Sequence, residues 1–195
     1  MTDYCACRRW ISLCAPIFFG KVYGISPMDS RSFKRDTRAN IMKRPRIYTD
    51  TSVIGGCLDR EFKTGSVALF ERFESGSAIM MISAITLSEL ESAPPRVRNI
   101  LTQVPAGNTR YVELTVEAEQ LANNYLSEGV VSMKSLADAE HIAIATINHA
   151  DVLVSWNFKH IVNLERIRGY NAVNLKQGYP MMEIRTPLEV LSHEY

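Results

Sequence analysis

Short apolar runs take turns with segments of helical period along most of the chain, and this alternation limits the fold more than any other feature. The runs at residues 47–49, 78–83 and 152–156 have the length and apolar character of buried strands. Between them, apolar residues recur at the spacing of one helix face. Such a pattern predicts a three-layer α/β/α fold with a mostly parallel central sheet covered by helices on both faces.

Turn and cap signals divide the helical segments. Gly55-Gly56 is interpreted as a break after the first strand, Pro94-Pro95 as an interruption between two helices, and Thr186-Pro187 as a helix start. A short apolar segment near residues 172–175 is expected to be separate from the helix before it. Helices are expected around Val67, Phe70 and Phe73, and at residues 86–92, 97–104, 114–128, 135–148 and 158–166.

The chain has 195 residues, which suits one ordinary domain with a sizeable core. Charge is distributed unevenly: residues 1–41 carry seven Lys and Arg against three Asp, whereas residues 42–195 carry fifteen basic against eighteen acidic side chains. Residues 26–38 are polar and lack apolar periodicity. We therefore expect residues 1–41 to be a basic extension, disordered or from a non-native start, and residues 42–195 to form the folded domain.

Several classes of protein are disfavoured by composition. Three of the four cysteines lie in the basic extension and only Cys57 lies in the body, so a disulfide framework is not expected. The apolar run at residues 10–20 is too short to span a bilayer. A cytoplasmic protein without a membrane segment is the expectation. The net charge of +1 gives no global basic field of the kind typical of nucleic-acid binders.

Acidic and polar side chains are placed where a parallel sheet binds ligands, outside the carboxyl ends of its strands. Asp50 closes the first strand and Asn157 closes the run at residues 152–156. Glu89 and Asp138 lie on helices among apolar neighbours. A carboxylate in such a setting needs a partner, and no nearby lysine or arginine is an obvious one. Mg²⁺ or Mn²⁺ would serve, since both prefer carboxylate and water oxygens.

Three blocks in this order resemble the PIN-domain family of metal-dependent ribonucleases, and within it the VapC-type toxins of bacterial toxin–antitoxin pairs. The blocks read IYTDTSVIGG, ISAITLSELE and DAEHIAIATINHADVLVSWNFKHIVN. The resemblance covers most of residues 42–195. It implies an acidic cluster that holds Mg²⁺ or Mn²⁺ for hydrolysis of RNA phosphodiester bonds. Asp50, Glu89 and Asp138 match the first three acids, and Asn157 stands where many members have a fourth.

Three further polar residues are candidates for substrate contact or support of the acids. Ser52 can offer its hydroxyl to the metal shell or cap the turn. His141 lies one helical turn from Asp138 and can orient that carboxylate, although a structural histidine is the commoner case. His160 closely follows Asn157 and can meet a substrate phosphate or stay solvated. Asp151 precedes its strand and is expected to be structural.

Other functions fit the sequence less well. A haloacid-dehalogenase-like phosphatase needs a second Asp where Ser52 stands, and the Gly55-Gly56 pair does not form a dinucleotide-binding motif. The remaining alternative is a PIN-like module that has lost turnover and binds RNA or protein, for which Asn157 is the best support. Besides RNA, the candidate partners are an antitoxin protein and a second copy of the chain.

Overall fold

The computed structural model describes residues 44–192, so the expectations for the basic extension and for the domain boundary at Met42 concern residues outside the described part. The order of the elements is β1 (Arg46–Thr49), α1 (Thr51–Gly56), α2 (Lys63–Glu74), β2 (Ile79–Ser83), α3 (Ala84–Glu91), α4 (Pro95–Leu101), the 3-10 turn η1 (Ala106–Asn108), β3 (Thr109–Val112), α5 (Val116–Ser127), the 3-10 turn η2 (Met133–Ser135), α6 (Leu136–Ile147), β4 (Val152–Val154), α7 (Leu164–Lys176), β5 (Ile184–Arg185) and α8 (Pro187–Ser192).

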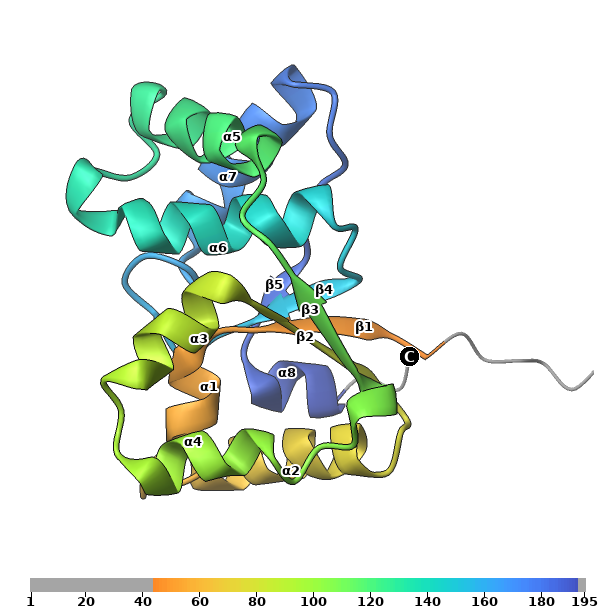
Figure 1. The fold of residues 1–195 in the computed structure, drawn as a ribbon. Coiled ribbons are helices and arrows are strands. Elements are labelled where there is room, and N and C mark those ends of the chain that lie inside the picture. Colours follow the sequence, from red (N-terminus) through yellow and green to blue (C-terminus); the bar gives the residue numbers. More distant parts are fainter. Residues whose placement is uncertain (1–43, 193–195) are drawn as a thin grey trace, which may run out of the picture. The chain divides into compact units, whose positions relative to one another are not determined.

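The central sheet contains five strands in the order β3-β2-β1-β4-β5, and every neighbouring pair is parallel. Helices α5, α6 and α7 cover one face, and α1, α2, α4 and α8 lie on the other (Figure 1). The predicted three-layer α/β/α class is therefore confirmed. In the register of β1 with β4, Thr49 pairs with Val154, so the residues that follow these strands begin side by side.

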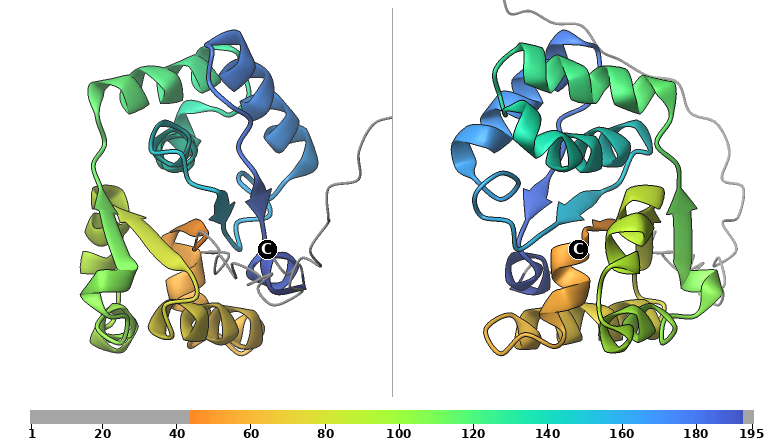
Figure 2. Two further views of the ribbon diagram at one scale, coloured as in Figure 1. Left: turned by 90° about the vertical axis from the view of Figure 1, so that its right-hand side faces the viewer. Right: turned by 60° about the vertical axis from the view of Figure 1, so that its left-hand side comes forward.

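Side chains of the sheet alternate between two cores. Ile47 packs with α1 and α2 on one face, whereas its neighbour Tyr48 packs with α5 and α6 on the other. The same alternation separates Met80 from Met81 in β2. Figure 2 shows the two helical layers on either side of the strands. Because both faces are covered, the central strands β1, β2 and β4 are buried along most of their length, as expected for a parallel sheet.

In the first half of the chain one expectation is wrong and one strand is missing from the prediction. Gly55 and Gly56 do not form a break after the strand but are the last two residues of helix α1. Nothing lies close to a side chain built at Gly55, but one at Gly56 would come within 2.4 Å of the Ser66 hydroxyl. Strand β3 was not foreseen, because Thr109 and Arg110 are polar and Tyr111 is 65% exposed at the edge of the sheet. An edge strand buried on one side lacks the continuous apolar run used to find the others.

The expected helix at residues 158–166 and the separate segment near 172–175 are also wrong, since both are replaced by the single helix α7. Gly169 lies in the middle of this helix, where a glycine suggests a helix end, but here the glycine is needed because the Val130 side chain packs against it. A Cβ at this position would lie 2.8 Å from Cγ1 of Val130. The helix start at Thr186-Pro187 is confirmed, with the Thr186 hydroxyl accepting from the backbone N–H of Glu189 at 3.3 Å.

The two edges of the sheet differ in character. At the amino edge, Asp151 forms an ion pair with Arg46 at 3.2 Å and accepts from its backbone N–H, which agrees with the structural role expected for it. The opposite, carboxyl edge carries the acids singled out above. Among residues 44–192, no helix is long and apolar enough to cross a membrane.

Candidate active site

Asp50 lies at the turn between β1 and α1, where it is the N-cap of the helix. Its Oδ1 accepts from the backbone N–H of Val53 at 3.3 Å and from the Ser52 hydroxyl at 2.6 Å. Its Oδ2 accepts from the Ser155 hydroxyl, also at 2.6 Å. The residue is only 5% exposed. Both carboxylate oxygens are therefore held by short hydrogen bonds in a nearly closed site.

Glu89 reaches the same region from α3. Its Oε2 accepts a hydrogen bond from the hydroxyl of Thr51, the residue next to Asp50. The Nε2 atom of His141 lies 3.4 Å from the same oxygen. His141 thus contacts Glu89, and not Asp138 as its helical spacing suggested. His141 as a residue is 3% exposed.

Asp138 projects from the first turn of α6 and is bound by Asn157, whose Nδ2 donates to Oδ1 at 2.7 Å. The backbone N–H of Asn157 donates in turn to the Ser155 hydroxyl at 2.8 Å. Because that hydroxyl donates to Asp50, a continuous chain of hydrogen bonds runs from Asp138 to Asp50. Glu89 lies beside this chain, since it is hydrogen-bonded to Thr51, which follows Asp50 directly in the sequence. The four residues singled out in the sequence therefore share one polar network.

The charges of this network are unequally stabilised. Burial raises the pKa of the Asp50 carboxyl, although His141 and the two serine hydroxyls oppose the rise. Burial likewise raises the pKa of Asp138, with His160 and His141 opposing it. The pKa of Glu89 is lowered, chiefly by its hydrogen bond with His141. Two of the three carboxylates are thus less stable as anions than in water.

In residues 44–192, no lysine or arginine forms an ion pair with these three acids. The same part of the chain also contains no group of three or more His, Cys, Asp and Glu side chains gathered closely enough to hold a metal ion. Mg²⁺ commonly needs fewer protein ligands than three, because it is bound through one or two carboxylates together with waters and substrate phosphates. The desolvated carboxylates of Asp50 and Asp138, which have no lysine or arginine partner in this part of the chain, fit that manner of binding. Residues 44–192 contain no preformed cage of three carboxylates.

The remaining predicted residues lie around the same network. The Ser52 hydroxyl donates to Asp50 and accepts from the backbone N–H of Trp156 at 2.9 Å, which ties the turn after β1 to the end of β4. His160 donates its backbone N–H to Asn157 Oδ1 at 3.1 Å. Its buried Nδ1 has no hydrogen-bond partner among the described residues.

Four polar residues of this region were not singled out in the sequence: Tyr48, Thr51, Ser83 and Ser155. Thr51 lies between Asp50 and Ser52, and Ser155 lies two positions before Asn157, so the motif itself held a signal for them. Tyr48 and Ser83 lie within strands, and their hydroxyls meet at 2.8 Å inside the core. Residues buried in strands give no sign in the sequence of the polar partner they find.

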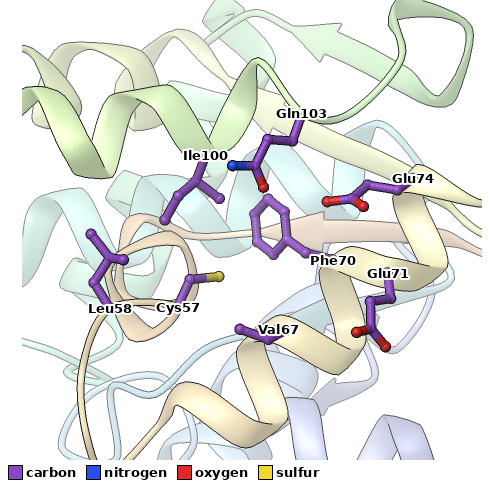
Figure 3. A pocket seen from close by; sticks show the side chains of 8 residues that line it. All are labelled: Cys57, Leu58, Val67, Phe70, Glu71, Glu74, Ile100 and Gln103. Carbon is purple, nitrogen blue, oxygen red and sulfur yellow. The ribbon is translucent and has the colours of Figure 1, made fainter.

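A cavity of about 330 Å³ lies elsewhere, between α1, α2 and α4 (Figure 3). Phe70 and Ile100 line it together with the thiol-bearing Cys57, and Glu71 and Glu74 lie at its margin. None of the acids of the polar network lines this cavity. It is therefore separate from the candidate active site.

No protein-family model matches the chain, and no curated protein matches it. Its structure is similar to that of VapC20 from Mycobacterium tuberculosis, described as a sarcin-ricin loop cleaving toxin, with 16% identity, a TM-score of 0.46, and 58% of this chain and 91% of that one covered. It is also similar to VapBC2 from Rickettsia felis, solved bound to a DNA fragment from its promoter, with 12% identity, a TM-score of 0.47, and coverage of 72% and 98%. A third similar structure is that of FitAcB from Neisseria gonorrhoeae, with 16% identity, a TM-score of 0.47, and 73% of this chain and 98% of that one covered.

VapC20 and VapBC2 carry the name of the toxin group that the sequence motifs resemble. All three TM-scores are below 0.5 and all identities are 16% or less.

Proposed function

We propose that this chain is a metal-dependent endoribonuclease of the PIN type, with its active site at the carboxyl edge of the sheet. The observation that carries the proposal is the polar network itself. Asp50 and Asp138 are joined by hydrogen bonds through Ser155 and Asn157, and Glu89 is hydrogen-bonded to Thr51, the residue next to Asp50. None of the three acids is paired with lysine or arginine among residues 44–192. Carboxylates without a basic partner at one edge of the sheet favour a divalent cation and a phosphate substrate.

Asp50, Glu89 and Asp138 are the residues that would hold Mg²⁺ or Mn²⁺. When bound, such an ion supplies an activated water and stabilises the charge that develops on the phosphate oxygens. The chain contributes orientation. Ser52 and Ser155 hold the Asp50 carboxylate from both sides, and Asn157 holds Asp138 without adding a negative charge.

RNA as the substrate is supported by the residues directly after Asn157. Phe158 is 51% exposed and its ring lies 6.1 Å from that of Trp156, which in turn stacks on Phe62 at 4.7 Å. Lys159 beside it is exposed. An exposed aromatic ring next to a cation is suited to stack a base and to contact the backbone phosphate of a single strand. We infer an unpaired stretch of RNA as the substrate.

The biological role that we propose is that of the toxin in a toxin–antitoxin pair, acting in the cytoplasm. Its support is the resemblance of the three sequence blocks to VapC-type toxins. An antitoxin protein and a second copy of the chain are the partners that this role implies. A neighbouring reading frame that encodes a small DNA-binding protein, and its co-purification with this chain, would test the role.

A second candidate function is a PIN-like module that binds RNA without cleaving it. Two observations favour it: the described residues contain no preformed group of three metal ligands, and position 157 holds a neutral amide that already binds Asp138. The two candidates predict the same RNA binding and differ in turnover.

The deciding experiment uses single-stranded and duplex RNA with added Mg²⁺ or Mn²⁺, and compares the wild type with Asp50→Asn and Asp59→Asn. Asp59 is exposed after α1, so its variant controls for the loss of one acid. We expect cleavage of single strands by the wild type and by Asp59→Asn, and none by Asp50→Asn or in excess EDTA. Cleavage that survives EDTA or the Asp50 substitution would refute the nuclease mechanism. Metal-independent binding of RNA without any cleavage would favour the second candidate.

A further inference from the structure

A buried polar connection leads from the first strand to the Glu89 carboxylate. The hydroxyl of Tyr48, a fully buried residue of β1, donates to Ser83 Oγ at 2.8 Å and lies 2.7 Å from Nδ1 of His141. The other nitrogen of that ring, Nε2, lies 3.4 Å from Oε2 of Glu89. The connection therefore links β1 to α3 through a histidine of α6.

The protons of this connection can be counted. An ionised carboxylate only accepts hydrogen bonds, so Nε2 of His141 carries the hydrogen of its contact with Oε2 of Glu89. If Tyr48 donates to Ser83, Nδ1 of His141 must also carry a hydrogen, which it donates to the Tyr48 oxygen, and the ring is then an imidazolium cation. If Tyr48 turns its proton to the ring, Nδ1 accepts it and the ring is neutral. In both arrangements the Tyr48 hydroxyl satisfies Nδ1 and the Nε2–H is directed to Glu89.

We propose that Tyr48 and His141 are positioning residues for Glu89, which they hold through Oε2 while Oε1 is left for an ion or its bound water. This inference rests on the proposed function, which it deepens by assigning the groups that orient one of the ligands. Thr51 supports the same oxygen from the side of Asp50. Of the two carboxylate oxygens of Glu89, Oε2 has hydrogen-bond partners among the described residues and Oε1 has none.

A purely structural role would not require this chemistry. A buried hydroxyl and a buried imidazole each need a partner, whereas apolar side chains of similar size pack in a core without one. The same core provides a comparison in Tyr125, which is also fully buried and whose hydroxyl donates to Asn174. From Asn174 the hydrogen bonds continue to Thr146 and the backbone oxygen of Ile142, and they reach none of the acids. Tyr125→Phe is therefore a matched control for Tyr48→Phe.

The first measurement is calorimetric titration of the full chain with Mn²⁺ alone. We expect Tyr48→Phe to bind Mn²⁺ about 10- to 100-fold more weakly than the wild type, the usual effect of removing a group that orients a metal ligand. Tyr125→Phe should leave the affinity unchanged. His141→Gln retains a side-chain donor and should keep more of the affinity than His141→Leu. Equal affinity in the wild type and Tyr48→Phe would overturn the inference.

The second measurement does not depend on a metal. Nitrogen-15 spectra of the imidazole rings and the carboxyl carbon-13 signal of Glu89 should change in Tyr48→Phe and stay as in the wild type in Tyr125→Phe. If wild-type protein bound no Mn²⁺ yet these signals moved, the proposed nuclease function would fail while the positioning of Glu89 stood. Unchanged signals for His141 and Glu89 in a folded Tyr48→Phe protein would show that Tyr48 only fills the core.

Discussion

The side-chain amide of Asn157 donates to Oδ1 of Asp138 across 2.7 Å, while its own Oδ1 accepts from the backbone N–H of His160 at 3.1 Å. Asn157 thus acts as a neutral clamp on an acid whose pKa burial raises. An aspartate at position 157 could still accept from the backbone N–H of His160, but it could no longer donate to Asp138. It would also put a second negative charge against Asp138.

The first prediction concerns this clamp. Asn157→Asp should lower the free energy of unfolding without metal, by about 1 to 3 kcal/mol, because it breaks a hydrogen bond to a charged group and adds like-charge repulsion. The same repulsion is relieved by a cation, so Mn²⁺ should bind the variant more tightly than the wild type. Turnover need not rise, since tighter binding of the ion in the ground state does not favour the transition state. Denaturation and calorimetry with Mn²⁺ test both parts, and unchanged Mn²⁺ affinity would place residue 157 outside the metal shell.

The second prediction follows from the buried Asp50. Its pKa is raised above the ordinary value of 3.8, so the folded state holds this proton more strongly than the unfolded state. Between the two pKa values the folded state carries more protons, and stability therefore falls as pH rises through that range. Asp50→Asn removes this penalty and should raise the free energy of unfolding by about 1 kcal/mol at neutral pH. The difference should shrink as the pH is lowered toward 3.8.

A bound ion should reverse that order of stability. At a Mn²⁺ concentration about 100 times its dissociation constant, the wild type gains about 2.7 kcal/mol, which Asp50→Asn cannot gain if Asp50 is a ligand. Thermal unfolding of both proteins with Mn²⁺ and with EDTA measures the effect. Equal stabilisation of both by Mn²⁺ would argue that Asp50 does not hold the ion.

The third prediction concerns Glu89, whose shift has the opposite sign. Its pKa is lowered, chiefly by His141, so ionised Glu89 adds stability above its ordinary pKa of 4.5 and this contribution is lost as the pH falls through its folded value. Glu89→Gln should therefore destabilise the metal-free protein at neutral pH. The side chain is 38% exposed and solvent screens the interaction, so the loss should be about 0.5 kcal/mol. Glu91→Gln, on the same helix and exposed, is the control and should have no measurable effect.

The fourth prediction tests the contact with RNA. If a base stacks on Phe158, Phe158→Ala should weaken the binding of a single-stranded oligonucleotide by about 1 to 3 kcal/mol. Phe158→Trp should keep the affinity, because it retains an aromatic face. Tyr111→Ala is the control, since it removes an aromatic side chain that is 65% exposed on the edge strand β3. Fluorescence anisotropy in EDTA measures binding without cleavage, and equal losses from both alanine variants would count against a stacking site.

Local patterns were enough to predict the layered α/β fold and the places of Asp50 and Asn157. A buried strand needs a run of apolar residues, and the first polar residue after such a run marks its carboxyl end. That logic requires only neighbours in the chain. It failed for β3 and for α7, where edge exposure and the contact of Gly169 with Val130 depend on distant residues.

The partners of the acids were decided by tertiary structure. Ser155 reaches Asp50 over 105 positions of sequence because β4 pairs directly with β1, with Thr49 opposite Val154. His141 is directed to Glu89 because its Nδ1 is hydrogen-bonded to Tyr48, which lies on the face of β1 that packs against α5 and α6. Strand order and register set these meetings, and neither is encoded in the spacing of residues within one segment. The sequence by itself determined which chemical groups stand at the edge of the sheet, and the pairing of strands determined which of them touch.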